Sequence, residues 1–246
     1  MHLPEGREDF HTLSWLEYGN LMLGKFDEAR KNVDLAWQAA DRSPQNPNIA
    51  QQYHTMLARY ILETGKWEKI PLEGSMEAPA DHAAMPGMPA GGPGHTGSGA
   101  WIFIAGLGAA RLGDPERADQ ARAKLSAMRQ DVESAGDAYA AKPLAIMENE
   151  VGAAVELARG QKSEAVGLAK QAADIEATLA APSGPPEPIK PALEYYAEVL
   201  LDAGRPAEAA AAFEQELLRT PKRTPSVQGL ARVAAKGSAQ TAAVER

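Results

Sequence analysis

The sequence predicts an all-α protein, an α-solenoid of about five helix-turn-helix hairpins. Two observations lead to this prediction. A glycine follows an apolar helical pattern at several points along the 246 residues, and a second helical pattern with an alanine five residues after the glycine then begins. The apolar residues also recur with a period near 3.6, and no run alternates with the period of two that a half-buried strand requires.

The first hairpin is expected to begin near residue 10 and to turn at Gly24, with Phe26 and Ala29 on its second helix. A helical stretch over 51–62 follows and ends at Gly65, a weaker copy of the turn. Ile70 and Pro71 stand where a second helix would be established after Gly65. Because proline removes a backbone donor and disrupts a helix interior, no regular second helix is expected there.

The second half of the chain carries the clearer turns. An apolar helix over 100–110 leads to Gly113, and further hairpins turn at Gly160 and Gly204. Asp114 with Pro115 suits the first turn of the following helix. A glycine past a helix end adopts the left-handed conformation without a Cβ clash. A last weak copy of the turn, at Gly237, follows a helical stretch over 227–234.

Two segments rich in proline or glycine interrupt the helices. Segment 71–99 has too many of both to form a regular element and is expected to be a long loop. Segment 180–191 is shorter, and its prolines predict an extended connector across one face of the array. The expected organisation is therefore N-terminal hairpins over 1–70, the loop over 71–99 and C-terminal hairpins over 100–246, in one continuous solenoid.

The hairpins resemble the tetratricopeptide repeat (TPR) family. The best unit, residues 190–223, matches its packing positions at Leu193, Tyr196, Ala197, Leu200, Gly204, Ala209, Phe213 and Pro221. Two departures stand out, because Glu17 and Glu216 occupy positions where the family has small residues. The chain is similar to the C-terminal part of larger bacterial repeat proteins. This resemblance implies a scaffold that holds a protein or peptide, and the chain can be a fragment of a longer protein.

Composition narrows the classes of function. The net charge of −8 and the pI near 5.2 argue against nucleic acid as a partner, which requires a basic surface. No stretch is long and apolar enough to predict a membrane-spanning helix. The sequence contains no cysteine, which excludes thiolate chemistry and disulfides. Cytoplasm and periplasm both remain open as compartments.

The sequence offers little catalytic chemistry. The five histidines are dispersed, and no nucleophile elbow or phosphate-binding loop is present. We therefore expect no enzyme activity and no cofactor. An alternative is a copper-handling protein, because thioether and imidazole groups suit Cu(I) and the loop contains Met76, His82, Met85, Met88 and His95. A second alternative is an accessory repeat domain of a larger enzyme.

The resemblance also implies where a ligand would lie. In the TPR family ligands contact the concave face, lined by the first helix of each hairpin. The corresponding positions here are Tyr18, Arg59, Phe103, Leu107, Glu150, Ala154, Glu194, Glu198 and Leu201. Core packing is the favoured alternative for Phe103 and Leu107. Glu150, Glu194 and Glu198 predict a negative groove and a partner with basic residues, and the connector 182–191 is the second candidate surface.

Overall fold

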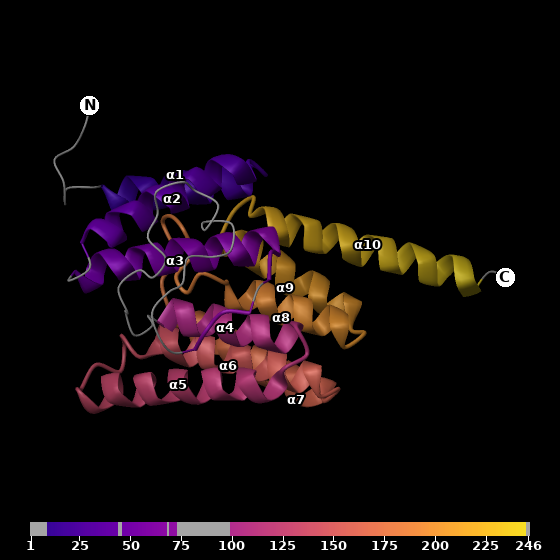
Figure 1. Ribbon diagram of the computed structural model, residues 1–246. Helices are drawn as coiled ribbons and strands as arrows, with labels where there is room; N and C mark the ends of the chain where they lie inside the picture. Colours follow the sequence, from indigo (N-terminus) through magenta and orange to yellow (C-terminus); the bar gives the residue numbers. More distant parts are fainter. Residues whose placement is uncertain (1–8, 44–45, 68, 73–98, 245–246) are drawn as a thin grey trace. The chain divides into compact units, whose positions relative to one another are not determined.

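The computed structural model describes residues 9–43, 46–67, 69–72 and 99–244. Within these ranges it is helical and contains no strand, so the predicted all-α fold of helical hairpins is confirmed (Figure 1). The helices are α1 (Phe10–Met22), α2 (Phe26–Arg42), α3 (Pro47–Thr64), α4 (Gly99–Arg111), α5 (Pro115–Ser134), α6 (Lys142–Ala158), α7 (Lys162–Glu176), α8 (Ala192–Asp202), α9 (Pro206–Arg219) and α10 (Thr224–Val244).

The glycine turns have the predicted left-handed backbone. The φ angles are 70° at Gly24, 83° at Gly113, 78° at Gly160 and 82° at Gly204. After each glycine, the next residue donates its N–H to a carbonyl five residues earlier, for example Arg205 to Leu200 at 2.9 Å. This bond satisfies a carbonyl that the helix end would otherwise leave unpaired. The turns that join α1 to α2, α4 to α5, α6 to α7 and α8 to α9 are therefore confirmed.

The alanine of the repeated pattern is where two helices meet. Ala29, Ala118, Ala165 and Ala209 are all fully buried. A methyl group at this position lets the helix axes approach closely, and larger side chains such as Phe213 fill the neighbouring space. The helix starts also follow the sequence, since the Asp114 carboxylate accepts the Arg117 N–H at 3.1 Å ahead of Pro115.

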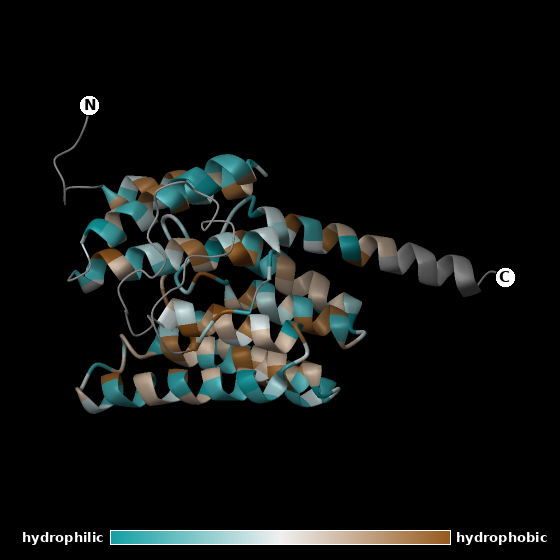
Figure 2. Ribbon diagram, viewed as in Figure 1, coloured by the Kyte–Doolittle hydropathy of each residue, from teal (hydrophilic) through white to brown (hydrophobic). Residues whose placement is uncertain are grey.

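The chain divides into two compact units, Met1–Ala105 and Gly106–Arg246. In the first unit α1, α2 and α3 pack against one another. In the second unit each helix from α5 to α10 packs on the next, and α8 also contacts α6 and α10. Figure 2 shows hydrophilic residues along much of the visible face of α5, as expected for a helix with one side turned to solvent.

Two expectations for individual elements differ from the structure. Gly237 does not form a turn, because α10 continues through it to Val244. The connector after α7 is not a straight extended segment but bends repeatedly, and Ile189, Lys190 and Pro191 are buried. After Gly65 no second helix appears in the described residues up to 72, as predicted. Loop positions 73–98 lie outside the described residues, so their assignment stays a prediction.

Among the described helices, none is long and apolar enough to cross a membrane.

Candidate functional site

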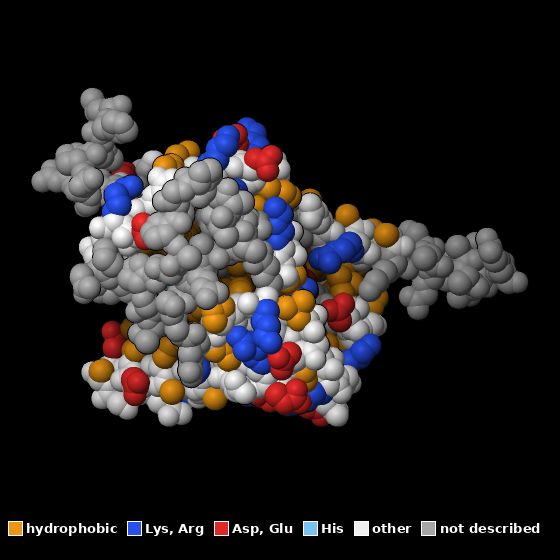
Figure 3. Space-filling model, in the orientation of Figure 1, with side chains coloured by type: hydrophobic (Ala, Val, Ile, Leu, Met, Phe, Trp, Pro, Cys, Tyr) orange, Lys and Arg blue, Asp and Glu red, His pale blue; other side chains and the backbone are white. Residues whose placement is uncertain are grey.

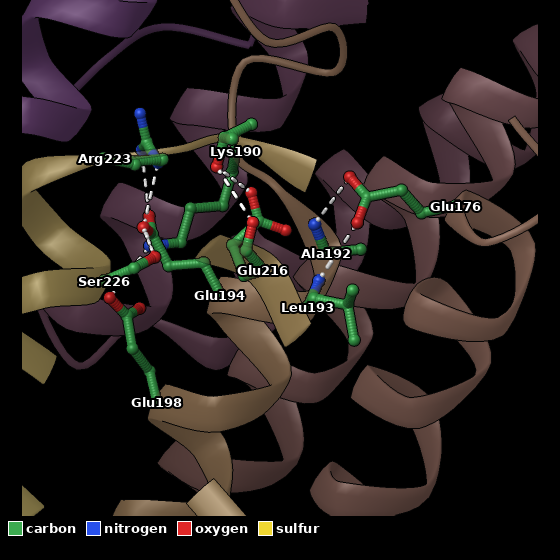
Figure 4. A network of polar contacts seen from close by, with 10 residues as sticks. Glu176, Lys190, Ala192, Leu193, Glu194, Glu198, Glu216, Arg223 and Ser226 are labelled. Atoms are coloured by element: carbon green, nitrogen blue, oxygen red, sulfur yellow. Dashed lines mark hydrogen bonds and ion pairs between the residues drawn. The ribbon is translucent and has the colours of Figure 1, made fainter. Parts of the chain in front are cut away.

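A buried polar network centred on Glu194 lies in the second unit, as Figure 4 shows. The Glu194 carboxylate is fully buried and accepts hydrogen bonds from Lys190 Nζ at 2.9 Å and from Arg223 Nε at 2.8 Å. Ser226 Oγ donates a further bond at 2.5 Å. Lys190 also pairs with Glu198 at 2.8 Å. The network thus ties the connector, α8 and the start of α10 together.

Local structure explains how these groups meet. Glu194 lies in the first turn of α8, where the partial positive charge of the helix end favours a carboxylate. Lys190 reaches it from the last residues of the connector. Arg223 follows Lys222, whose positive φ of 64° bends the chain sharply between α9 and α10. That turn aims the guanidinium back at α8.

Electrostatics hold Glu194 in its ionised form. Burial alone would raise its pKa, but the positive charges of Lys190 and Arg223 outweigh this and lower the pKa to about 2. Burial would likewise lower the pKa of Lys190, and the carboxylates of Glu194 and Glu198 raise it instead. The network is therefore a set of internal ion pairs at neutral pH.

A second buried carboxylate closes the start of α8. Glu176, the last residue of α7, accepts the N–H of Ala192 at 3.0 Å and that of Leu193 at 3.2 Å. Helix starts leave such N–H groups without partners, and Pro191 at the N-cap offers no side-chain acceptor. Glu176 supplies the cap from a neighbouring helix, as Figure 4 shows.

Two further glutamates have unsatisfied oxygens. Both carboxylate oxygens of Glu150 on α6, and Oε2 of Glu216 on α9, accept no hydrogen bond from the described residues. Burial raises the pKa of Glu150 well above its ordinary value, and nearby Glu176 raises it further. Burial raises the pKa of Glu216 to about 7, although a hydrogen bond from the Thr220 hydroxyl opposes the shift.

A narrow crevice lies beneath the connector. It holds about 10 Å³, roughly the room one water molecule needs. Glu176 and Glu216 both line it, together with Arg219, the last residue of α9, and Thr220, which follows it. The connector covers it with Pro182, Pro186, Glu187 and Pro191.

A comparable ion pair lies in the first unit. Glu17 on α1 is fully buried and accepts a hydrogen bond from Arg59 Nη1 of α3 at 2.6 Å. Arg59 also donates to the Ser14 hydroxyl at 3.0 Å. Burial raises the pKa of Glu17 to about 7 in spite of the arginine charge. The pair joins α1 to α3 from the inside.

The predicted groove residues are mostly interior. Seven are buried, namely Arg59, Phe103, Leu107, Glu150, Ala154, Glu194 and Leu201, and two, Tyr18 and Glu198, are half-buried. The structure brings Glu150, Glu194 and Glu198 together near Lys190. Tyr18, Arg59 and Phe103 belong to the first unit. No observation tests whether any of the nine contacts a ligand, so that role stays a prediction.

The premise of a free acidic groove needs correction. Glu194 is neutralised by Lys190 and Arg223, and Glu150 favours its protonated form because it is buried. Neither residue can offer a solvent-exposed negative charge to a partner. Figure 3 shows Lys and Arg side chains close to Asp and Glu side chains on the visible face, rather than a continuous acidic surface.

The connector is a weaker candidate surface than its prolines suggested. Pro186, Pro188 and the following residues up to Pro191 are buried against the second unit. Sequence reasoning missed its role as a cover for Glu176 and Glu216. The signal that could have revealed the interior carboxylates was present, since Glu17 and Glu216 stand at positions where small buried residues were expected.

A surface depression of the second unit has a volume of about 340 Å³. It lies where the end of α5, the α5–α6 turn, the start of α6 and the end of α7 meet. We call its apolar lining residues the floor (Ala138, Ala141, Ala145 and Ile175) and its polar lining residues the rim (Glu133, Lys142, Asp174 and Thr178).

The rim carries more negative than positive charge. Glu133 pairs with Arg129 at 2.8 Å, and Asp174 pairs with Lys170 at 2.7 Å, both through exposed carboxylates. Lys142 is already engaged, since it donates to the Thr178 hydroxyl and lies over the Tyr139 ring. Exposed ion pairs contribute little to stability, so the two carboxylates are available to a competing cation.

The described residues contain no group of three or more His, Asp or Glu side chains arranged to hold a metal ion. The methionine and histidine positions of the copper alternative, from Met76 to His95, lie outside the described residues. That alternative stays a prediction.

No protein-family model matches the sequence, and no curated protein matches it. Among solved structures, the chain is similar to a thermophilic TPR protein of Thermus thermophilus, with 21% sequence identity and a TM-score of 0.49. The similarity covers 92% of this chain and 99% of that one. At this score it carries no argument about function, and the fold rests on the helices and turns described above.

Proposed function

We propose that the chain is a non-catalytic scaffold that binds a protein or peptide segment in the depression between α5, α6 and α7. The observation that carries the proposal is the combination of an apolar floor and an acidic rim in a hollow of about 340 Å³. Binding sites of this size are typically concave and apolar with a few polar groups that fix orientation. The preferred segment has an apolar side chain with a basic residue beside it.

The two halves of the depression support different parts of this partner. Ala141, Ala145 and Ile175 leave space that a leucine-sized side chain can fill, which removes apolar surface from water. Glu133 and Asp174 lie at the edge, where a lysine or arginine of the partner can replace Arg129 or Lys170. Charge at such a rim selects the partner and speeds encounter more than it tightens binding.

The acidic residues of the interior do not take part in this proposal. Glu194 and Glu176 already use their oxygens within the protein, and a ligand that displaced those bonds would leave buried groups unpaired. The proposed partner therefore still carries basic residues, as expected from the sequence, but it binds at the depression instead of the groove of α6 and α8.

Two fluorescein-labelled peptides of sequence Gly-Lys-Leu-Lys-Gly and Gly-Glu-Leu-Glu-Gly test the proposal by fluorescence anisotropy. We expect the basic peptide to bind at least about tenfold more tightly, equivalent to 1.4 kcal/mol. The substitution Ala145→Phe fills the depression and should lower the affinity for the basic peptide by a similar factor. Ala158→Phe, at an exposed position on the same helix, should leave the affinity unchanged.

Equal affinity for the two peptides would refute the role of the acidic rim. Equal losses in Ala145→Phe and Ala158→Phe would refute the depression as the site. Circular dichroism of each variant confirms that the helices remain intact before the affinities are compared.

A further inference from the structure

We propose that Glu176 and Glu216 together hold one proton and that this proton keeps the connector 180–191 seated on the ends of α7 and α9. Loss of the proton to solvent would release the connector. The device is independent of the peptide site proposed above.

Two carboxyl groups line the same narrow crevice beneath the connector. Glu176 ends α7, Glu216 lies in the last turns of α9, and both line the crevice of about 10 Å³ beneath the connector. Glu216 is only 1% exposed. Its Oε1 accepts the Thr220 hydroxyl, whereas its Oε2 has no hydrogen-bond partner among the described residues.

The surrounding charges do not neutralise a second carboxylate in this space. Lys190 from the connector and Arg223 from the α9–α10 turn are bound to Glu194 of α8. Glu187 of the connector is exposed and adds a negative charge at the crevice. Arg219 is the remaining cation that lines it, and its guanidinium donates to the carbonyls of Leu179 and Ala180 at the start of the connector.

The protonation energetics support the same conclusion. Burial raises the pKa of Glu216 to about 7, with the charges of Glu176 and Glu194 acting in the same direction and the Thr220 hydrogen bond and the charge of Arg223 acting against it. Burial also raises the pKa of Glu176, although its two backbone hydrogen bonds favour the ionised form. Two carboxylates in a low-dielectric space resist ionising together. Glu176 therefore carries the charge and Glu216 carries the proton.

Ionisation of Glu216 would act on both ends of the connector. The new carboxylate would attract Arg219, which is three residues further along the same helix and within side-chain reach. Arg219 would then leave the carbonyls of Leu179 and Ala180. Repulsion between Glu216 and Glu176 would weaken the bonds that Glu176 makes to the Ala192 and Leu193 amides.

Hydrogen exchange at the Ala192 and Leu193 amides of the full chain tests this proposal. After correction for the intrinsic rate, we expect protection in the wild type to fall as the pH rises from 4.5 to 7, by up to about tenfold for each pH unit, and to level off above 7, where Glu216 is already ionised. Glu216→Gln keeps the side chain neutral and should make protection independent of pH. Glu214→Gln, at an exposed position on α9, should behave as the wild type.

Constant protection of these two amides in the wild type across the same pH range would overturn the proposal. So would the same loss of protection in Glu216→Gln as in the wild type. If Glu216→Gln does not fold, the ¹³C shift of the wild-type Glu216 carboxyl decides instead. A midpoint near 7 supports the proposal, and a midpoint below about 5, close to that of an ordinary glutamate, overturns it.

Discussion

Removal of the charge at Glu194 should destabilise the second unit far more than removal of an exposed glutamate. In Glu194→Gln the side chain keeps its size and loses its charge. Arg223, which is 2% exposed, then loses its ion pair with the Glu194 carboxylate, and Lys190 keeps its pair with Glu198. Removing one member of a buried ion pair costs about 3–5 kcal/mol, because the other charge stays buried without compensation.

This cost is large compared with the total stability of a domain, which is about 5–15 kcal/mol. The exposed pair between Arg205 and Glu208 provides the matched control, since both side chains are substantially exposed. Glu208→Gln should leave the unfolding transition close to that of the wild type. A third variant, Glu194→Leu with Arg223→Met, replaces charge by apolar contact and should recover most of the loss.

The distribution of tryptophan allows each unit to be followed separately. All four tryptophans, Trp15, Trp37, Trp67 and Trp101, belong to the first unit. In urea, fluorescence therefore reports the first unit, while ellipticity at about 222 nm reports the helices of both. Glu194→Gln should shift the ellipticity transition and leave the fluorescence transition in place. A loss below about 1 kcal/mol would show that the network is not a buried structural contact.

Two further predictions concern other interior contacts. The folded-state pKa of Glu17, about 7, lies above the ordinary value of 4.5, so its contribution to stability is complete below pH 4.5 and is lost as the pH rises to 7. By linkage, this loss of stability is on the order of 3 kcal/mol. Unfolding monitored by fluorescence should detect the loss in the wild type and not in Glu17→Gln. A wild type whose stability does not change with pH would contradict the prediction. In the second unit, Gly106→Ala should lower the melting temperature, since the added Cβ would lie 2.8 Å from the Cβ of Ala121. Gly167→Ala adds a methyl group to a helix where the space is open, so it should raise the melting temperature slightly. Equal melting temperatures of the two variants would contradict the close contact at Gly106.

Most of the helical architecture could be predicted from the sequence because its determinants are local. A glycine at a helix end and an alanine five residues later specify a turn and a close contact, and Gly113 with Ala118 meets both expectations. Gly237 also has an alanine five residues later, Ala242, but α10 passes through it. The spacing of glycine and alanine therefore defines a turn only where the preceding helix ends at the glycine.

The candidate site could be predicted much less well. Helical periodicity shows that Glu194 lies on one face of α8, but it does not show what covers that face. The covering groups, Lys190 and Arg223, come from a connector and a turn, where no periodic pattern exists. The depression beside Ile175 depends on how three helix ends meet, which is a property of tertiary packing rather than of any one segment.

A surface depression and an interior network are the two candidate sites, and one NMR titration compares them directly. The basic peptide Gly-Lys-Leu-Lys-Gly is added to ¹⁵N-labelled protein and the amide shifts are mapped on the chain. We predict that the largest shifts occur at Ala141, Ala145 and Ile175. Largest shifts at Glu198 and Leu201 on α8, with none around Ala145, would contradict the proposed site and restore the groove expected from the sequence.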